Sequence, residues 1–187
     1  MNPASILRGL SALICAYALV SISAFSPPEG FVPLFNGRNL DGWEVASLGA
    51  AWKVNDQILE NHSGHSAIIS AKKYRNYILI FEWRVPKDDP HSNAPYLYVD
   101  RGPQTTGVRE RFRNAFFFPE ATLPPNLVGN WNRSRVTVEG ERCTIEVNDR
   151  VVRTSEKLAG GTEPGKFGIG RDGARLDIAN IYIKELK

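Results

Sequence analysis

The chain has 187 residues, a formal net charge of +3, 42% hydrophobic residues and 10% aromatic residues. This near-balanced charge gives no reason to expect nucleic acid as a partner. The length is that of one domain, which buries roughly 70% of its unfolded surface without a metal or a disulfide. Aromatic side chains in a chain rich in β-forming segments point to sugar stacking, although most of them belong to the core.

The first 23 residues are predicted to be a secretory signal peptide. Arg8 precedes an apolar run over residues 9–20, and small residues follow where a signal peptidase cleaves. The run is too short for a membrane span, so we expect a secreted or periplasmic protein with no stable membrane anchor. Cleavage would remove Cys15 and leave Cys143, which excludes an intramolecular disulfide.

Residues 24–30 are predicted to be a linker, and residues 31–187 to be the folded domain. A first strand is expected at 31–35, with Pro33 at an edge or at the start of the strand. The Asp41-Gly42 turn should lead into a core tryptophan, Trp43. Further strands are expected at 51–54, 57–60, 66–71, 94–100, 135–140, 141–147 and 165–170, with a turn at Asn55-Asp56 between the first two.

The strand predicted over residues 76–85 is the longest apolar one. Alternation places Tyr77, Leu79, Phe81, Trp83 and Val85 on one face, which must pack on a core. The opposite face begins apolar and ends charged, so it is expected to be buried at one end and wet at the other. A strand of this kind belongs in the middle of a large sheet.

The last predicted strand, residues 175–186, changes phase along its length. Leu176 and Ile178 share one face by alternation, whereas Ile181 and Ile183 share the opposite one. This slip near Ala179-Asn180 predicts a β-bulge. No segment after the first 23 residues shows a helical apolar period. About ten short strands with regular turn signals therefore predict an all-β sandwich of antiparallel sheets.

The chain resembles the 3-keto-disaccharide hydrolase domain family. The similarity lies in several segments that occur in the family's order: 33–43, 51–54 followed by Ile58-Leu59, 76–84, 129–132, 147–152 and 178–186. The resemblance implies a concanavalin A-like jelly roll with a bent, concave sheet that holds carbohydrate. It also implies cleavage of glycosides or disaccharides already oxidised to a ketone at C3, or, alternatively, a non-catalytic carbohydrate-binding module of the same fold.

Residues 107–113 stand where the family carries an acidic run, and here Glu110 is the one carboxylate among three arginines. The resemblance makes Glu110 the candidate acid or base, because a carboxyl between Val108 and Phe112 would have a raised pKa if it were buried. An ion pair with an arginine explains the same pattern. Arg111 and Arg113 fit either an anionic substrate or a solvated edge strand.

Four more residues are candidates for contact with sugar. Tyr96 and Tyr98 share one face of a predicted strand, Arg101 follows that strand, and Trp131 begins a later segment. Their rings offer flat surfaces on which a pyranose can stack, and packing in the core is the competing interpretation. His62 and His65 are spaced too loosely to predict a metal site. No cofactor is expected, and a structural calcium ion cannot be recognised from sequence.

Overall fold

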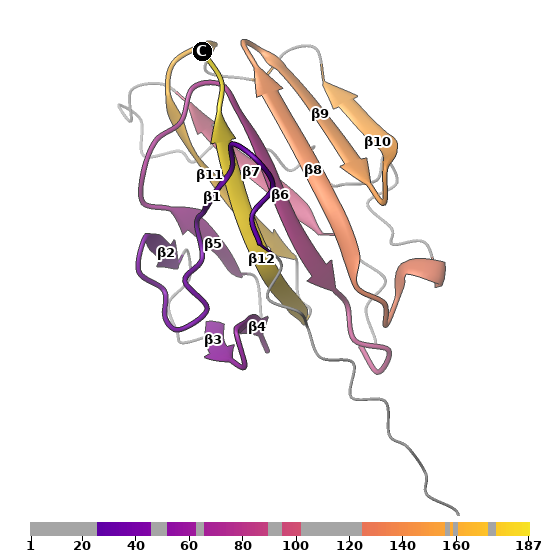
Figure 1. Ribbon diagram of the computed structural model, residues 1–187. Helices are drawn as coiled ribbons and strands as arrows, with labels where there is room; N and C mark the ends of the chain where they lie inside the picture. Colours follow the sequence, from indigo (N-terminus) through magenta and orange to yellow (C-terminus); the bar gives the residue numbers. More distant parts are fainter. Residues whose placement is uncertain are drawn as a thin grey trace, which may run out of the picture.

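The computed structural model describes residues 26–45, 52–62, 66–89, 95–101, 125–155, 158, 161–171 and 175–187. Within these ranges, twelve strands form two antiparallel sheets that stack on each other, with one short 3-10 turn, η1 (Pro125–Leu127) (Figure 1). The structure confirms the predicted all-β, jelly-roll architecture. No helix in the described ranges is long and apolar enough to cross a membrane.

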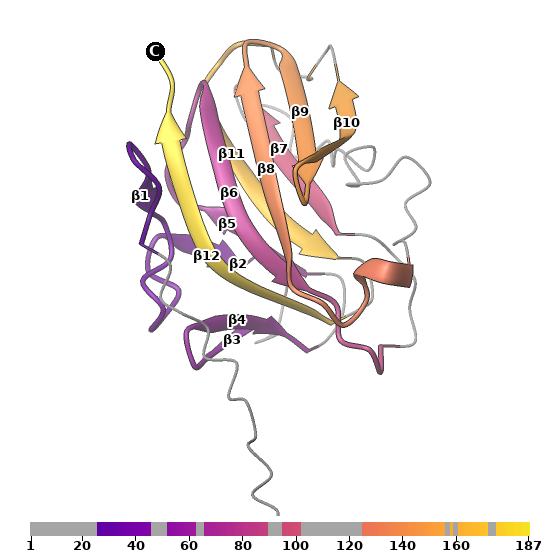
Figure 2. The same cartoon turned by 45° about the vertical axis from the view of Figure 1, so that its right-hand side comes forward.

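The larger sheet has eight strands, in front of the smaller sheet in Figure 2. Its order is β10 (Arg150–Ser155), β9 (Arg142–Val147), β8 (Asn132–Glu139), β6 (Tyr77–Arg84), β12 (Leu176–Glu185), β4 (Ile58–Asn61) and β3 (Trp52–Asn55), while β1 (Val32–Pro33) pairs with β12. The smaller sheet has the order β2 (Trp43–Val45), β5 (Ser66–Ser70), β11 (Gly165–Arg171) and β7 (Tyr96–Arg101).

The predicted central strand is β6, and it lies between β8 and β12 as expected. Its inward side chains Tyr77, Leu79, Phe81 and Trp83 are each 0% exposed. They meet inward residues of the smaller sheet, among which Phe167 packs 5.3 Å from the Tyr77 ring. Each buried side chain of this size stabilises the fold by about 1.5–3 kcal/mol. Trp83 also donates a hydrogen bond from Nε1 to Ser134 Oγ at 2.8 Å, which satisfies its buried polar group.

The structure confirms the bulge predicted in the last strand. The register of β12 against β6 shifts between Ala179 and Tyr182, and Asn180 has a positive φ of 51°. The bulge turns Ile178 and Ile181 toward the same core, where both are buried. It also turns the side chain of Asn180 toward β6, where Nδ2 donates to Glu82 Oε2 at 2.8 Å.

One turn lies one residue later than the sequence predicted. The hairpin of β3 and β4 turns at Asp56 and Gln57, with φ of 45° and 64°, rather than at Asn55-Asp56. Asn55 remains in β3 and pairs with Ile58. A two-residue hairpin turn of this type needs positive φ at both central residues, and Gln57 was not recognised as a residue that adopts it.

Candidate functional site

Strand β7 carries three of the predicted sugar-contacting residues. Each lies opposite a glycine of β11, in the register Tyr96–Gly170, Tyr98–Gly168 and Arg101–Gly165. Glycine inside a strand removes the side chain that would otherwise cover the neighbouring backbone, and it commonly marks a place of close approach. Gly168 and Gly170 therefore leave the backbone beside Tyr96 and Tyr98 without covering side chains on one face of the smaller sheet, and we call these four positions the β7 strip. Alternation puts Arg101 and Gly165 on the opposite face of the sheet.

An ion pair lies on the same face of β11 as Gly168 and Gly170. Lys166, two residues before Gly168, donates from Nζ to Glu44 Oε1 of β2 at 2.6 Å. The two residues come from strands separated by β5, so their side chains cross over that strand. The pair gives this end of the smaller sheet a polar boundary.

The proposed acid or base, Glu110, lies outside the described residues, and so do Arg111 and Arg113. The segment between β7 and η1 that contains them is not described. Their roles therefore stay predictions from the sequence resemblance.

Trp131 lies on the eight-stranded sheet, at the entrance to β8, and it is partly exposed. The guanidinium carbon of Arg84 lies 4.9 Å from the centre of its ring. Such a cation over an aromatic face contributes about 0.5–1 kcal/mol at exposed sites. Tyr96 and Tyr98 belong to the other sheet, so the described contacts do not bring the three predicted rings into one site.

Asp177 of β12 holds Arg84 in place over Trp131. Arg84 donates from Nε at 2.9 Å and from Nη2 at 2.6 Å to the same oxygen, Oδ2 of Asp177. The Asp177 side chain is mostly buried, whereas Arg84 is at the edge of solvent. Across the sheet, Asp177 lies opposite Glu60 of β4, whose Oε2 is 2.7 Å from Nε2 of His62. His62, which the sequence did not predict to bind a metal, is thus paired with Glu60, and Glu60 lies beside Asp177 across the sheet.

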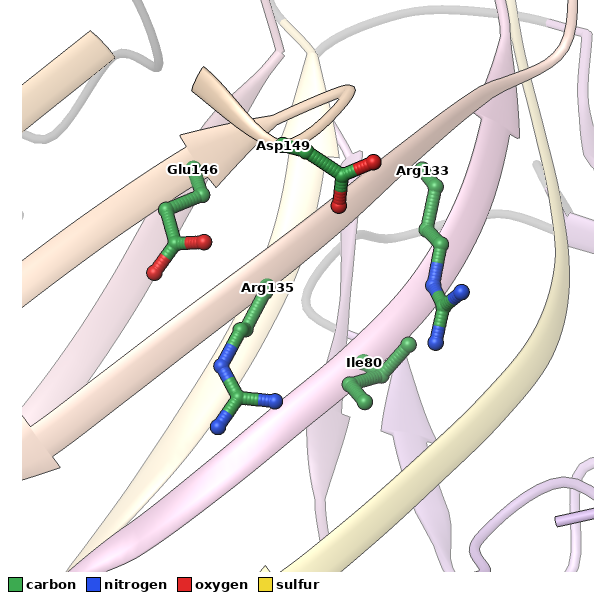
Figure 3. Close-up of a pocket in the computed structure, with 5 residues that line it drawn as sticks. All are labelled: Ile80, Arg133, Arg135, Glu146 and Asp149. Atoms are coloured by element: carbon green, nitrogen blue, oxygen red, sulfur yellow. The ribbon is translucent and has the colours of Figure 1, made fainter. Parts of the chain in front are cut away.

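A pocket lies further along the outer face of this sheet (Figure 3). It encloses about 90 Å³ and is lined by Ile80, Arg133, Arg135, Glu146 and Asp149. Tyr182 of β12 lies opposite Ile80, and burial, together with the charge of Glu82, raises the pKa of its phenol above 10.0. None of the residues that line this pocket was predicted from the sequence to be functional. Alternation along the sequence shows that Arg133 and Arg135 share the outward face of β8. It cannot show the pocket, because the other lining residues come from other parts of the chain.

Within the described ranges, no group of three or more histidine, cysteine or acidic side chains is arranged to hold a metal ion. Cys143 is buried and takes part in no disulfide in the part of the chain that the structure describes.

The fold is that of a jelly-roll β-sandwich, and comparison with known proteins defines it more closely. Residues 30–109, which contain β1 to β7, match the model of the 3-keto-alpha-glucoside-1,2-lyase-like domain. This match confirms the family resemblance over the N-terminal part of the domain. No curated protein matches the chain.

Solved structures extend the similarity over most of the chain. A presumed glycosyl hydrolase from Parabacteroides distasonis is 18% identical with a TM-score of 0.61, over 85% of this chain and 95% of that one. The carbohydrate-binding module CBM66 from Bacillus subtilis is 16% identical with a TM-score of 0.57, over 79% and 98%. The carbohydrate recognition domain of Emp46p is 10% identical with a TM-score of 0.52, over 79% and 90%. At these identities the likeness establishes the fold and leaves the activity open.

Proposed function

We propose that this chain is an exported carbohydrate-active domain that cleaves 3-keto-glycosides, as a lyase or as a hydrolase. The observation that carries this proposal is the match of residues 30–109 to the 3-keto-alpha-glucoside-1,2-lyase-like domain. The β7 strip supports it, because the two tyrosines predicted to contact sugar each lie opposite a glycine on the same face of the smaller sheet.

The proposed chemistry uses the acidity that a C3 ketone gives to the proton at C2. A base removes this proton, the C1–O bond breaks, and a double bond forms between C1 and C2. The leaving oxygen takes a proton from a general acid. Water then adds across the double bond in a hydrolase, whereas the unsaturated keto-sugar leaves unchanged in a lyase. Glu110 is our candidate for the base, and Arg111 and Arg113 would stabilise the enolate oxygen.

Exchange of the C2 proton tests this proposal separately from bond cleavage. The 3-keto forms of p-nitrophenyl α- and β-glucoside are incubated with the full chain in D₂O. We expect nitrophenol release, and deuterium at C2 of the recovered substrate and of any hydrated product. The mass of the sugar product distinguishes addition of water from elimination alone. Glu110→Gln should lower both rates by about 10²–10⁴-fold while sugar binding survives.

Glu139→Gln is the matched control, because Glu139 is an exposed carboxylate on β8 and has no role in the proposed chemistry. It should retain the activity of the wild type. Turnover unaffected by Glu110→Gln would keep the activity and reject Glu110 as the base.

A carbohydrate-binding module without catalysis is the second candidate. It is favoured by the single carboxylate among the arginines at 107–113 and by the CBM66-like fold. In that case the wild type would bind the keto-glucosides saturably and release no nitrophenol.

A further inference from the structure

The pocket on the outer face of the eight-stranded sheet is built from residues far apart in the chain. Ile80 of β6 forms its floor, and Figure 3 shows the guanidinium groups of Arg133 and Arg135 on either side of it. Glu146 of β9 and Asp149 of the turn after it complete the lining. The pocket lies on a different sheet from the β7 strip.

Strand alternation and the hydrogen bonds of one side chain, Asn148, determine how the lining residues of the pocket are arranged. Ser134 and Val136, which alternate with the two arginines along β8, are fully buried, so the arginines must point outward. The turn that carries Asp149 is fixed to β8 by Asn148, whose Oδ1 accepts from the Arg133 amide at 2.9 Å. Asn148 Nδ2 also donates to Asn132 Oδ1 at 3.0 Å. Asp149 is therefore placed over the pocket by a rigid turn.

Three of the charged side chains that line this pocket, Arg135, Glu146 and Asp149, do not pair with one another. Arg135 and Glu146 lie directly opposite in the register of β8 and β9. Opposite charges in this arrangement normally pair across strands. Nevertheless, the part of the chain that the structure describes shows no ion pair or hydrogen bond from the side chains of Arg135, Glu146 or Asp149. Donors and acceptors are thus available to a ligand.

The balance of charge limits which ligand fits. Two guanidinium groups and two carboxylates line the pocket, so their formal charges cancel. An anion would be attracted by the arginines and repelled by the carboxylates, and a cation would meet the reverse. Hydroxyl groups satisfy both, because each one accepts from an arginine and donates to a carboxylate.

We propose that this pocket binds the hydroxyl-bearing edge of a neutral sugar, as a second carbohydrate-binding site on the face opposite the β7 sheet. Its volume of 90 Å³ is well below the roughly 300–1,000 Å³ of pockets that bury a whole small molecule, so it takes one edge of a ring rather than a whole disaccharide. Ile80 offers an apolar contact for the ring carbons. Trp131 precedes Arg133 by two residues on the same face of the sheet, which places the two residues about 7 Å apart along the strand direction. A second sugar ring of a bound oligosaccharide can stack on Trp131.

The inference goes beyond the proposed function, because binding at this pocket requires no catalysis. The test is a titration of the isotope-labelled full chain, which follows the Nε–H signals of Arg133 and Arg135 and the methyl signals of Ile80. The probes are the methyl glycosides of glucose, galactose and mannose, with D-glucuronate and inorganic phosphate as anionic comparators. We expect saturable shifts with at least one neutral glycoside, at lower concentration than with either anion.

Arg135→Met should weaken that binding by about tenfold, because it removes the charged donor and keeps the aliphatic stem. Asp149→Asn, which tolerates the positive φ of 62° at this position, is the second variant and should also weaken it. Arg142→Met alters an exposed arginine on the same face of β9 and should leave it unchanged.

Three outcomes would overturn the site: no saturable shift with any neutral glycoside, tighter binding of glucuronate or phosphate, or unchanged binding in Arg135→Met. The keto-glucoside assay on Arg135→Met separates this site from the proposed activity. Cleavage should persist in that variant, and failure of the wild type to cleave would reject the activity without affecting the binding result.

Discussion

Arg171 and Asp89 form an ion pair that is buried on both sides. Nη1 of Arg171 lies 3.0 Å from Oδ2 of Asp89, and the two side chains are 0% and 1% exposed. The same carboxylate oxygen accepts from the backbone amide of Arg175 at 2.8 Å. Burial lowers the pKa of the Arg171 guanidinium, and the charge of Asp89 opposes that shift. The pair ties the loop after β6 to the end of β11 and to the start of β12.

Asp89→Ala should destabilise the fold by about 3–5 kcal/mol, because it removes the carboxylate that balances the charge of the buried Arg171 guanidinium. Chemical denaturation followed by circular dichroism measures this loss. The neighbouring Asp88 provides the control: it pairs with Arg175 at 3.0 Å, but the side chains are 75% and 38% exposed. Asp88→Ala should therefore cost at most about 1 kcal/mol. Equal losses for the two variants would contradict the importance of burial here.

Trp83→Ala should cost about 3–5 kcal/mol. The side chain is fully buried on the inward face of β6, and truncation leaves a cavity and an unpaired Ser134 hydroxyl. The melting temperature measures the effect, and Val151→Ala, at an exposed position of β10, should leave it nearly unchanged. An unchanged melting temperature for Trp83→Ala would show that this face of β6 does not carry the core.

The alternation of apolar residues was enough to predict β6, the hairpin of β8 and β9, and the bulge of β12, because these features follow from which side chains face the core. Alternation does not say which strands become neighbours. It therefore gave no information on whether Trp131 lies near Tyr96 and Tyr98, and the structure puts them on different sheets. The pocket was missed for the same reason, since only the register of β8 and β9 places Glu146 opposite Arg135.

The positive φ of Asn180 predicts a distinct response to substitution at the bulge. Asn180→Val should destabilise the fold by about 1–2 kcal/mol, because a β-branched residue resists the left-handed conformation. Asn180→Gly accepts this conformation and loses only the hydrogen bond to Glu82, so it should cost less. Urea denaturation of both variants measures the difference. Equal losses for the two variants would mean that the hydrogen bond to Glu82, which both of them lose, outweighs the effect of φ at this position.

The raised pKa of Tyr182 predicts a dependence of stability on alkaline pH. Burial and then the charge of Glu82 favour the neutral phenol in the folded state. Because the pKa of the Tyr182 phenol is higher in the folded state, its contribution to the free energy of unfolding is complete below pH 10.0, the pKa of the phenol in the unfolded chain. This contribution is lost as the pH rises through the pKa of the folded state. Tyr182→Phe should flatten the decline of the unfolding midpoint above pH 10. An equally steep decline in this variant would assign the effect to other groups.

Trp131 provides an optical test for sugar on the eight-stranded sheet. The chain has four tryptophans, and Trp43, Trp52 and Trp83 are 8%, 4% and 0% exposed, whereas Trp131 is partly exposed. Maltose or trehalose, or their 3-keto forms, should therefore change the fluorescence of Trp131 alone, and the change should saturate. Trp131→Phe should abolish the signal, and Trp131→Ala should weaken binding about fivefold through loss of about 1 kcal/mol of aromatic contact. Iodide serves as the control, because the Arg84 cation beside the ring attracts it, and its quenching should also disappear in Trp131→Phe. A sugar-dependent signal that persists in Trp131→Phe would move the contact to another part of the domain.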